Sequence, residues 1–359
     1  MECMDEQQDL RLLMDCKRAM AKKHIPLPDI EAERRKFWQM HGEEESALHG
    51  EKPRKRIFTL KHWCIAASVA ALVFMGLYVY SYFEDRTPVV HTLVYEADHG
   101  AQDVRLSRGE SVFVLGANTS DSLLQDYGMV ANQKQLSMAT RKGALREKAM
   151  QTLSTPYGRD YEVTLSDGTR VVLNAKSELT FPNSFQGDAQ RVVSLKGEAY
   201  FQVKHDTKHP FIVRTDYFET KVLGTEFNIR AYSADEARVT LLQGHVQVGN
   251  SKTPLLDMKP NDQATLLPDG TLTKEQVDTY PFLKWKEGYF YFDDVSLVEV
   301  MRELGRWYNV DVLFENTKSM DYKMHFAADR DADLISALRN LNALGIVYAT
   351  LDGRRIVVH

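Results

Sequence analysis

The pattern of apolar and polar residues divides the chain into parts with different periodicities. Residues 5–22 carry apolar side chains three and four positions apart, which is the spacing of an amphipathic helix. Residues 63–83 form one unbroken apolar run. Apolar and polar residues then alternate through much of residues 92–278, as they do in half-buried strands. From residue 284 onward, short alternating stretches are interleaved with helical ones.

The apolar run from Trp63 to Phe83 predicts a transmembrane helix. Its 21 residues contain no charge, and at about 1.5 Å per residue they extend over about 31 Å, close to the ~30 Å hydrocarbon core of a bilayer. Aromatic residues occupy both ends, where rings favour the membrane interface. A buried helix of a soluble domain rarely lacks a polar face over this length, and a cleaved signal peptide is shorter. We therefore expect the membrane-span ends at Trp63 and Phe83.

Flanking charge predicts the orientation of this span. The basic residues before it are Lys52, Arg54, Lys55, Arg56 and Lys61, whereas Arg86 alone follows it closely, beside Glu84 and Asp85. Because basic flanks stay on the cytoplasmic side, residues 1–62 are expected in the cytoplasm and residues 84–359 in the periplasm. The same basic run is also typical of nucleic-acid binding, but a net charge of −5 gives the chain no general attraction to nucleic acid.

The segment before the span, residues 1–62, predicts two short helices. Residues 5–22 form the first, and Asp29 can cap a second that carries Phe37 and Trp38. So short a segment cannot bury these aromatic side chains in a core of its own. We expect a partner protein to cover them, while a helix on the membrane surface or a frayed helix is the alternative.

The exported residues predict an all-β domain and an α+β module. Residues 84–152 read as short strands followed by a polar linker, with a brief helix at 142–148. Residues 153–278 read as an all-β sandwich or solenoid, in which Ser166-Asp167-Gly168 forms a hairpin turn. Residues 284–359 read as strand–helix–strand twice in tandem, an α+β module of two βαβ half-units. Ser296 and Glu299 match a capping box, and Asp333 is expected to cap the second helix.

Motifs and composition point away from an enzyme. The chain contains no Gly-x-Ser-x-Gly, His-Glu-x-x-His or phosphate-loop motif. His205, Asp206 and His209 are more typical of an exposed hairpin tip than of a base or a metal pair. Glu198 has no second acid near it in the sequence, as glycoside hydrolysis requires. We expect no catalytic, cofactor-binding or metal-binding residue, and the inner residues Cys3, Cys16 and His24 lack zinc-ligand spacing.

Several blocks of the exported sequence resemble the FecR domain of bacterial transmembrane anti-sigma factors. These blocks are TPYGRDYEVTLSDGTRVVLNAKSELTFP, RVVSLKGEAYFQVKHDTKHPFIV, KVLGTEFNIRAY and VTLLQGHVQV. The final segment, from FYFDDVSLVEVMRELGRWYNVDVLFE to GRRIVV, is similar to the domain that follows FecR in Bacteroidota members, itself similar to secretin/TonB short N-terminal modules. The resemblance covers residues 150–359 closely and 63–96 loosely.

The resemblance implies a single-pass regulator of the inner membrane. In this family the outer domain reads the signalling domain of a TonB-dependent outer-membrane transporter, and the inner segment holds an extracytoplasmic-function (ECF) sigma factor. Release usually follows cleavage by site-specific membrane proteases, and no direct contact with nucleic acid is implied. Phe37 and Trp38 are then expected to contact the sigma factor, and strand 323–326 or 355–358 to dock the transporter by its edge.

Two questions stay open at the level of the sequence. The inner segment, residues 1–62, is shorter than the multi-helix domain common in the family, so it can inhibit or activate its sigma factor. The alternative of a different class is a membrane-anchored periplasmic scaffold or glycan-binding protein that has no sigma partner.

Overall fold

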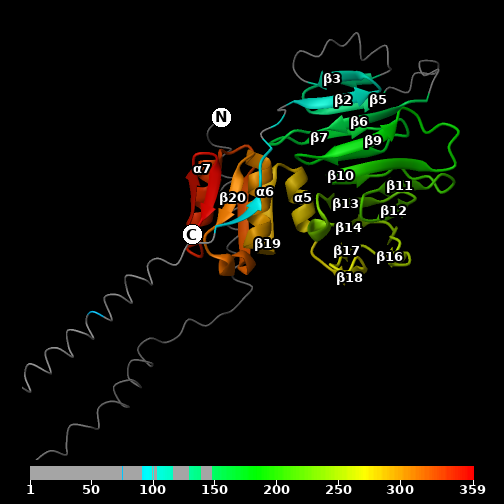
Figure 1. The fold of residues 1–359 in the computed structure, drawn as a ribbon. Coiled ribbons are helices and arrows are strands. Elements are labelled where there is room, and N and C mark those ends of the chain that lie inside the picture. The colour runs from blue at the N-terminus through cyan, green and yellow to red at the C-terminus, as the bar shows by residue number, and fades with distance from the viewer. Residues whose placement is uncertain (1–74, 76–90, 99, 101–102, 116–128, 139–147) are drawn as a thin grey trace, which may run out of the picture. The chain divides into compact units, whose positions relative to one another are not determined.

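The computed structural model describes residue 75 and residues 91–98, 100, 103–115, 129–138 and 148–359. The chain divides into two compact units, Met1–Val90 and His91–His359, and the second unit is described below (Figure 1). No helix within the described ranges is long and apolar enough to cross a membrane. The predicted span at 63–83 lies outside these ranges except for Met75, which is helical.

Strands β2 to β18 form an all-β domain, as the alternating sequence predicts. Its strands are β2 (Val104–Arg108), β3 (Ser111–Leu115), β4 (Met129–Ala131), β5 (Gln135–Met138), β6 (Met150–Ser154), β7 (Tyr161–Thr164), β8 (Arg170–Leu173), β9 (Glu178–Pro182), β10 (Arg191–Gln202), β11 (Phe211–Arg214), β12 (Glu219–Val222), β13 (Glu226–Ala231), β14 (Arg238–Gln243), β15 (Val246–Gly249), β16 (Leu256–Met258), β17 (Asp262–Leu266) and β18 (Leu272–Gln276). A short 3-10 helix, η1 (Ala234–Glu236), joins β13 to β14.

The strands pair in two series that share β10. One series runs β3-β2-β6-β9-β10-β11-β12-β15-β16. The other runs β4-β5-β7-β8-β10-β13-β14-β17-β18. Because one strand belongs to both, the pairings close into a single β structure.

Gly197 is the point at which β10 passes from one series to the other. Residues before it pair with β9 and β11, and Gly197 itself begins the ladder with β13. Its φ of +92° favours glycine, and a Cβ built there would lie 2.4 Å from Ser177 Oγ. The change of sheet therefore requires glycine at this position.

The core of the β domain lies between the two series of strands. Phe201 on β10 stacks on Phe227 of β13 with ring centroids 5.0 Å apart, and its ring also lies 6.3 Å from that of Phe211 on β11. The predicted hairpin between β7 and β8 is confirmed, with Gly168 at φ +87° in its turn. In these strands, buried apolar side chains alternate with more exposed polar ones, so the alternation in the sequence predicts which side chains are buried.

The polar linker predicted at the end of residues 84–152, from residue 116 onward, is wrong where the structure describes that stretch. Strands β4 and β5 lie within it, β6 begins in it, and all three belong to the β domain. Each is short and carries only one or two fully buried apolar residues, Met129, Leu136 and Leu153 among them. Val130 and Met150 are apolar but exposed, and Gln151 is polar but buried, so the alternation does not show in the sequence. Residues 142–147 of the expected helix lie outside the described ranges.

The C-terminal module follows the β domain and contains strand–helix–strand twice. Its elements are α5 (Tyr280–Lys286), β19 (Tyr289–Ser296), α6 (Leu297–Tyr308), β20 (Asp311–Phe314), η2 (Thr317–Asp321), β21 (Lys323–Asp329), α7 (Leu334–Asn342), β22 (Ala349–Asp352) and β23 (Arg355–Val358). The two half-units are interleaved, because β19 pairs with β21 while β20 pairs with β23. Asp333 caps α7 as predicted, by accepting a 2.8 Å hydrogen bond from Ser336 N. Ser296 stands at the N-cap of α6, but its side chain makes no capping bond within the described residues.

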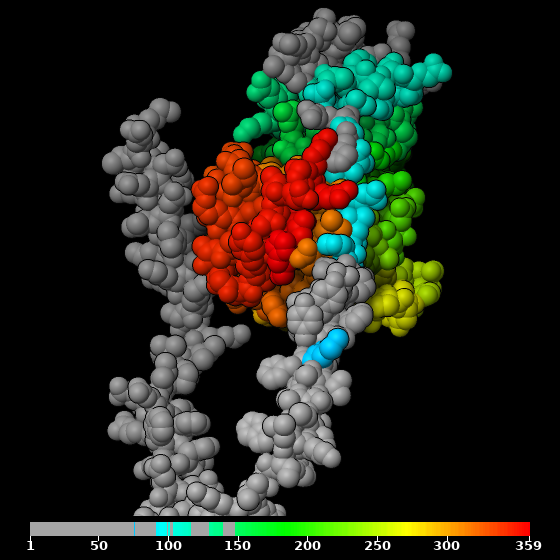
Figure 2. Space-filling model, turned by 60° about the vertical axis from the view of Figure 1, so that its left-hand side comes forward, coloured from blue at the N-terminus to red at the C-terminus, as the bar shows by residue number. Residues whose placement is uncertain are grey.

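Strand β1 (Thr92–Tyr95) belongs to the C-terminal module, although it precedes the β domain in the sequence. It pairs antiparallel with β20 at one edge of a four-stranded sheet of order β1-β20-β23-β22. Figure 2 shows this cyan segment against the orange and red atoms of the module. The same sheet places β23 between two neighbours, so the predicted free edge at 355–358 is wrong. Strand β21 pairs with β19 alone among the described strands.

Candidate functional site

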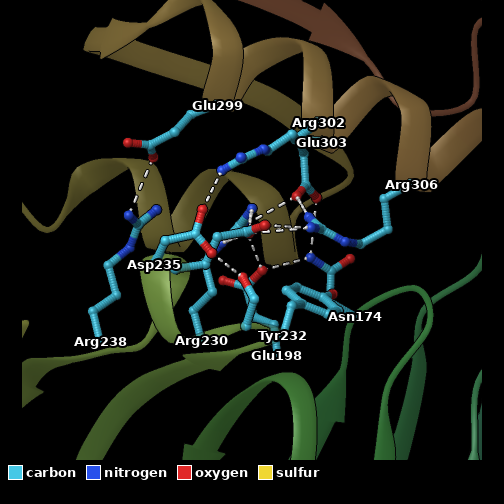
Figure 3. Close-up of polar contacts among 12 residues, drawn as sticks. Asn174, Glu198, Arg230, Tyr232, Asp235, Arg238, Glu299, Arg302, Glu303 and Arg306 are labelled. Atoms are coloured by element: carbon cyan, nitrogen blue, oxygen red, sulfur yellow. Dashed lines mark hydrogen bonds and ion pairs between the residues drawn. The ribbon is translucent and has the colours of Figure 1, made fainter. Parts of the chain in front are cut away.

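The predicted site residues cannot be placed, and a different cluster is prominent in the described structure. Phe37, Trp38, Trp63 and Phe83 lie outside the described residues. Six buried ionic side chains meet where the β domain contacts the C-terminal module (Figure 3). We call them the buried ionic network, which comprises Glu198, Arg230, Glu236, Glu303, Arg306 and Arg330.

Each domain supplies three members of the buried ionic network. Glu198 and Arg230 stand opposite each other on β10 and β13, and Glu236 follows in η1. The other three come from the C-terminal module: Glu303 and Arg306 on α6, and Arg330 just after β21. The side chains of α6 point down onto the strands of the β domain in Figure 3.

Glu303 is the centre of the network. Its carboxylate accepts hydrogen bonds from Arg230 at 3.0 Å, from Arg306 at 2.7 Å and from Arg330 at 2.9 Å. It also accepts a 3.2 Å hydrogen bond from the amide of Asn174, which follows β8. One carboxylate therefore joins guanidinium groups from both domains.

Arg230 is the matching centre on the side of the β domain. It donates to Glu198 at 3.0 Å and, through Nε, to Glu236 at 2.9 Å, in addition to Glu303. Glu236 in turn accepts from Arg306 at 3.0 Å, which closes a ring between the domains. Glu198 is held further by the amide of Asn228 and by Asn174, each at 2.9 Å. Hydrogen bonds between charged groups, such as these, are shorter and stronger than those between neutral groups.

Electrostatics keep Glu303 and Glu236 ionised despite their burial. Burial alone would raise the pKa of Glu303, but Arg230, Arg306 and Arg330 outweigh it and hold that pKa well below its ordinary value. The same balance lowers the pKa of Glu236, where Arg230 and Arg306 overcome the effect of burial. Both groups therefore serve as fixed anions rather than as proton donors near neutral pH.

The charges of the network are complementary between the domains. Glu198, Arg230 and Glu236 sum to one negative charge, and Glu303, Arg306 and Arg330 sum to one positive charge. Moving the domains apart would leave several of these groups desolvated without their partners, which costs far more than a surface pair. The network thus fixes the contact between the domains more than it adds to stability.

Two more accessible ion pairs flank the network along α6. Arg238 of β14 binds Glu299 at 3.1 Å, and Arg302 binds Asp235 of η1 at 2.8 Å. Glu299 is the residue that the capping-box pattern assigned to the helix N-terminus. Its carboxylate binds Arg238 of the β domain, so it does not supply the glutamate half of the expected capping box.

Strand β1 is in contact with the same helix. Arg306 stacks on Tyr232 with its Cζ 3.6 Å from the ring centroid, and it also lies 5.7 Å from the ring of Tyr95. Gly305 fits closely under that ring, since a Cβ on Gly305 would lie 2.7 Å from Tyr95 Cδ1. Arg302 Nε donates a 3.3 Å hydrogen bond to the Val94 carbonyl. The position of β1 therefore depends on α6, and α6 is held by the network.

Other candidate chemistry is accounted for by local structure. His209 Nδ1 lies 2.7 Å from Asp206 Oδ2 in an exposed turn, and this hydrogen bond lowers the pKa of Asp206 to about 2. Glu198 has acidic neighbours in space, because Glu303 and Glu236 share Arg230 with it. All three carboxylates are bound to arginines, which is a structural use. No group of side chains in the described ranges could hold a metal ion.

Comparison with known proteins matches both domains. The family model of the FecR protein matches residues 151–247, and that of the FecR C-terminal region matches residues 289–358. Two crystal structures of a candidate anti-sigma factor from Parabacteroides distasonis ATCC 8503, at 2.50 Å and 1.65 Å resolution, are similar to this chain. They share 30% and 31% identity with it, cover 58% of this chain and 98% of their own, and superpose with a TM-score of 0.53. No curated protein matches.

The β domain, the interleaved C-terminal module and these similarities define a regulatory protein of the anti-sigma class. The chain belongs to the FecR family of anti-sigma factors. Proteins of this family are in general membrane-anchored regulators of a sigma factor, a non-enzymatic role, and the described structure is fully compatible with it.

Proposed function

We propose that this protein is an inner-membrane relay between a TonB-dependent outer-membrane transporter and a cytoplasmic ECF sigma factor. One observation supports it most. Eight residues, 84–91, separate the predicted end of the span at Phe83 from strand β1, and β1 is built into the C-terminal module. Eight residues reach at most about 30 Å, so a span that ends at Phe83 would keep the C-terminal module close to the membrane.

The structure also favours transmission through one connected unit. The buried ionic network joins the β domain to α6, and α6 contacts β1. A transporter domain that binds the C-terminal module would thereby act on the segment leading to the span. A single membrane helix transmits little by rotation alone, so we favour release by proteolysis as the output.

On the cytoplasmic side, we propose that Phe37 and Trp38 anchor the sigma factor. Aromatic side chains supply much of the binding energy of small interfaces, and the segment before the span has no core of its own to hold them. Replacing both with Ala should abolish co-purification of the ECF sigma factor with the full chain from detergent-solubilised membranes. Leu10→Ala, an apolar change in the other predicted helix, is the matched control.

Undiminished recovery of the sigma factor with the double variant would refute the anchoring role. A wild-type chain that recovers no sigma factor, and whose deletion leaves sigma-dependent transcription unchanged, would refute the relay itself. It would favour a periplasmic scaffold or glycan-binding protein instead.

A further inference from the structure

The outer edge of β20 is occupied by a strand that comes from a distant part of the sequence. The module's own sequence supplies β20, β23 and β22, whereas β1 comes from the far side of the β domain. Ala97 N donates to the Asp311 side chain at 3.0 Å, a contact between residues 214 positions apart. The edge of β20 thus accepts an antiparallel strand that is not part of the module's own chain segment.

The pairing of β1 is weaker than that of the other strands in its sheet. All four strands of this sheet have four residues. The register of β1 with β20 shifts between Leu93 and Tyr95, whereas the β20–β23 and β22–β23 ladders are regular. Leu93 is 50% exposed, whereas Ile356 and Val358 on the central strand β23 are fully buried. Short edge strands with few buried apolar contacts open before the rest of a sheet. The other edge strand, β22, is joined to β23 by a tight turn after Asp352. Strand β1 has no such connection to its neighbour β20, so it can leave without unfolding the sheet.

We propose that the edge of β20 is a strand-acceptor site, with β1 as its resting occupant, and that an extended segment of a periplasmic partner replaces β1 there. The partner segment must run antiparallel to β20. It would place apolar side chains at the positions of Val94 and Tyr95, which face the core of the module, and tolerate a polar one at the position of Leu93. The identity of the partner rests on the proposed relay function, whereas the acceptor site does not.

Departure of β1 would change the connection to the membrane. With β1 in place, the residues between the predicted span and the fold are 84–91, which reach at most about 30 Å. With β1 released, the chain is next held at Asp98, whose N–H donates a 3.2 Å hydrogen bond to the Tyr157 hydroxyl of the β domain. The intervening residues, 84–97, reach about 50 Å. Proteases cleave extended chain that fits their active sites. Departure of β1 from β20 would therefore make the chain between the predicted span and the β domain a protease substrate. Strand exchange would convert binding at the module into cleavage next to the membrane.

A cross-strand disulfide tests the proposal in the full chain. Leu93 and Leu313 are direct partners across β1 and β20, and residues opposed in antiparallel pairs lie about 4.5–5.5 Å apart, within disulfide range. All three native cysteines lie at or before position 64, so the outer part of the chain adds no competing thiol. The matched control is Thr350→Cys with Val357→Cys, a pair across β22 and β23 in the same sheet.

In cells with a sigma-dependent reporter, oxidised Leu93→Cys/Leu313→Cys chain should lose induction by the transporter's ligand, and reduction should restore it. The Thr350→Cys/Val357→Cys chain and the two single variants should retain induction. An oxidised Leu93–Leu313 pair that permits full induction would overturn the proposal.

Native-state hydrogen exchange of the full chain in detergent separates this proposal from the relay function. The amides of β1 should exchange about a hundredfold faster than those of β23, because they open alone. Equal rates in β1 and β23 would show that β1 leaves only on global unfolding and would overturn the acceptor site. If no sigma factor responds to the wild-type chain, the relay function fails, and the exchange rates still decide whether β1 is exchangeable.

Discussion

Replacing Glu303 with Gln tests the buried ionic network at its centre. The substitution keeps the size of the side chain but removes the charge that three arginines bind at 2.7–3.0 Å. Removing one partner of a buried ion pair costs about 3–5 kcal/mol, because the remaining charges stay desolvated. Gln keeps one acceptor oxygen, so we expect the lower end of that range, about 3 kcal/mol. That is a large fraction of a typical domain stability of about 5–15 kcal/mol.

The assay is pulse proteolysis of the full chain in detergent across a urea series, which reports the free energy of unfolding. Glu299→Gln is the matched control on the same helix. Its ion pair with Arg238 is more accessible, at 34% and 22% side-chain exposure, so it should cost at most about 1 kcal/mol. If Glu303→Gln destabilises the chain no more than Glu299→Gln does, the network does not hold the domains together and the reasoning fails.

Two other predictions concern the same helix. The pKa values of Glu303 and Glu236 are lower in the folded chain than in the unfolded chain. Their contribution to the free energy of unfolding should therefore be complete at pH values above the unfolded-state pKa, and it should decline as the pH falls toward the folded-state pKa. The decline in urea midpoint between about pH 5 and pH 3 should be smaller in Glu303→Gln, and an identical decline would contradict this. Gly305→Ala would place a Cβ 2.7 Å from Tyr95 and 2.8 Å from Val312, so it should destabilise the chain by about 1–2 kcal/mol and speed hydrogen exchange in β1. Unchanged exchange in β1 would show that Gly305 does not support that strand.

The all-β domain and the α+β module could be predicted because their signals are local. The alternation in β7 and β8 and the Gly168 turn lie within a few residues of one another. The apolar face of α6 likewise shows in its own sequence, through Val300, Met301 and Leu304. Each of these elements buries one face, and that face appears in the sequence as apolar residues at the spacing of a strand or a helix.

The network and the place of β1 could not be predicted, because they depend on contacts between distant residues. Asn174 and Glu303 lie 129 positions apart, and Ala97 and Asp311 lie 214 apart. Charged residues such as Glu303 and Arg306 are usually solvated, so burial of both is the less expected outcome. Their i, i+3 spacing on the face of α6 beside Leu304 was the only local signal.

The measurement that tests the relay most directly is the amount of sigma factor bound to the full chain in membranes, before and after addition of the transporter's purified signalling domain. The account predicts that this amount changes with the wild-type chain and stays constant with the oxidised Leu93→Cys/Leu313→Cys chain. Sigma binding that does not respond to the signalling domain in the wild-type chain would contradict it.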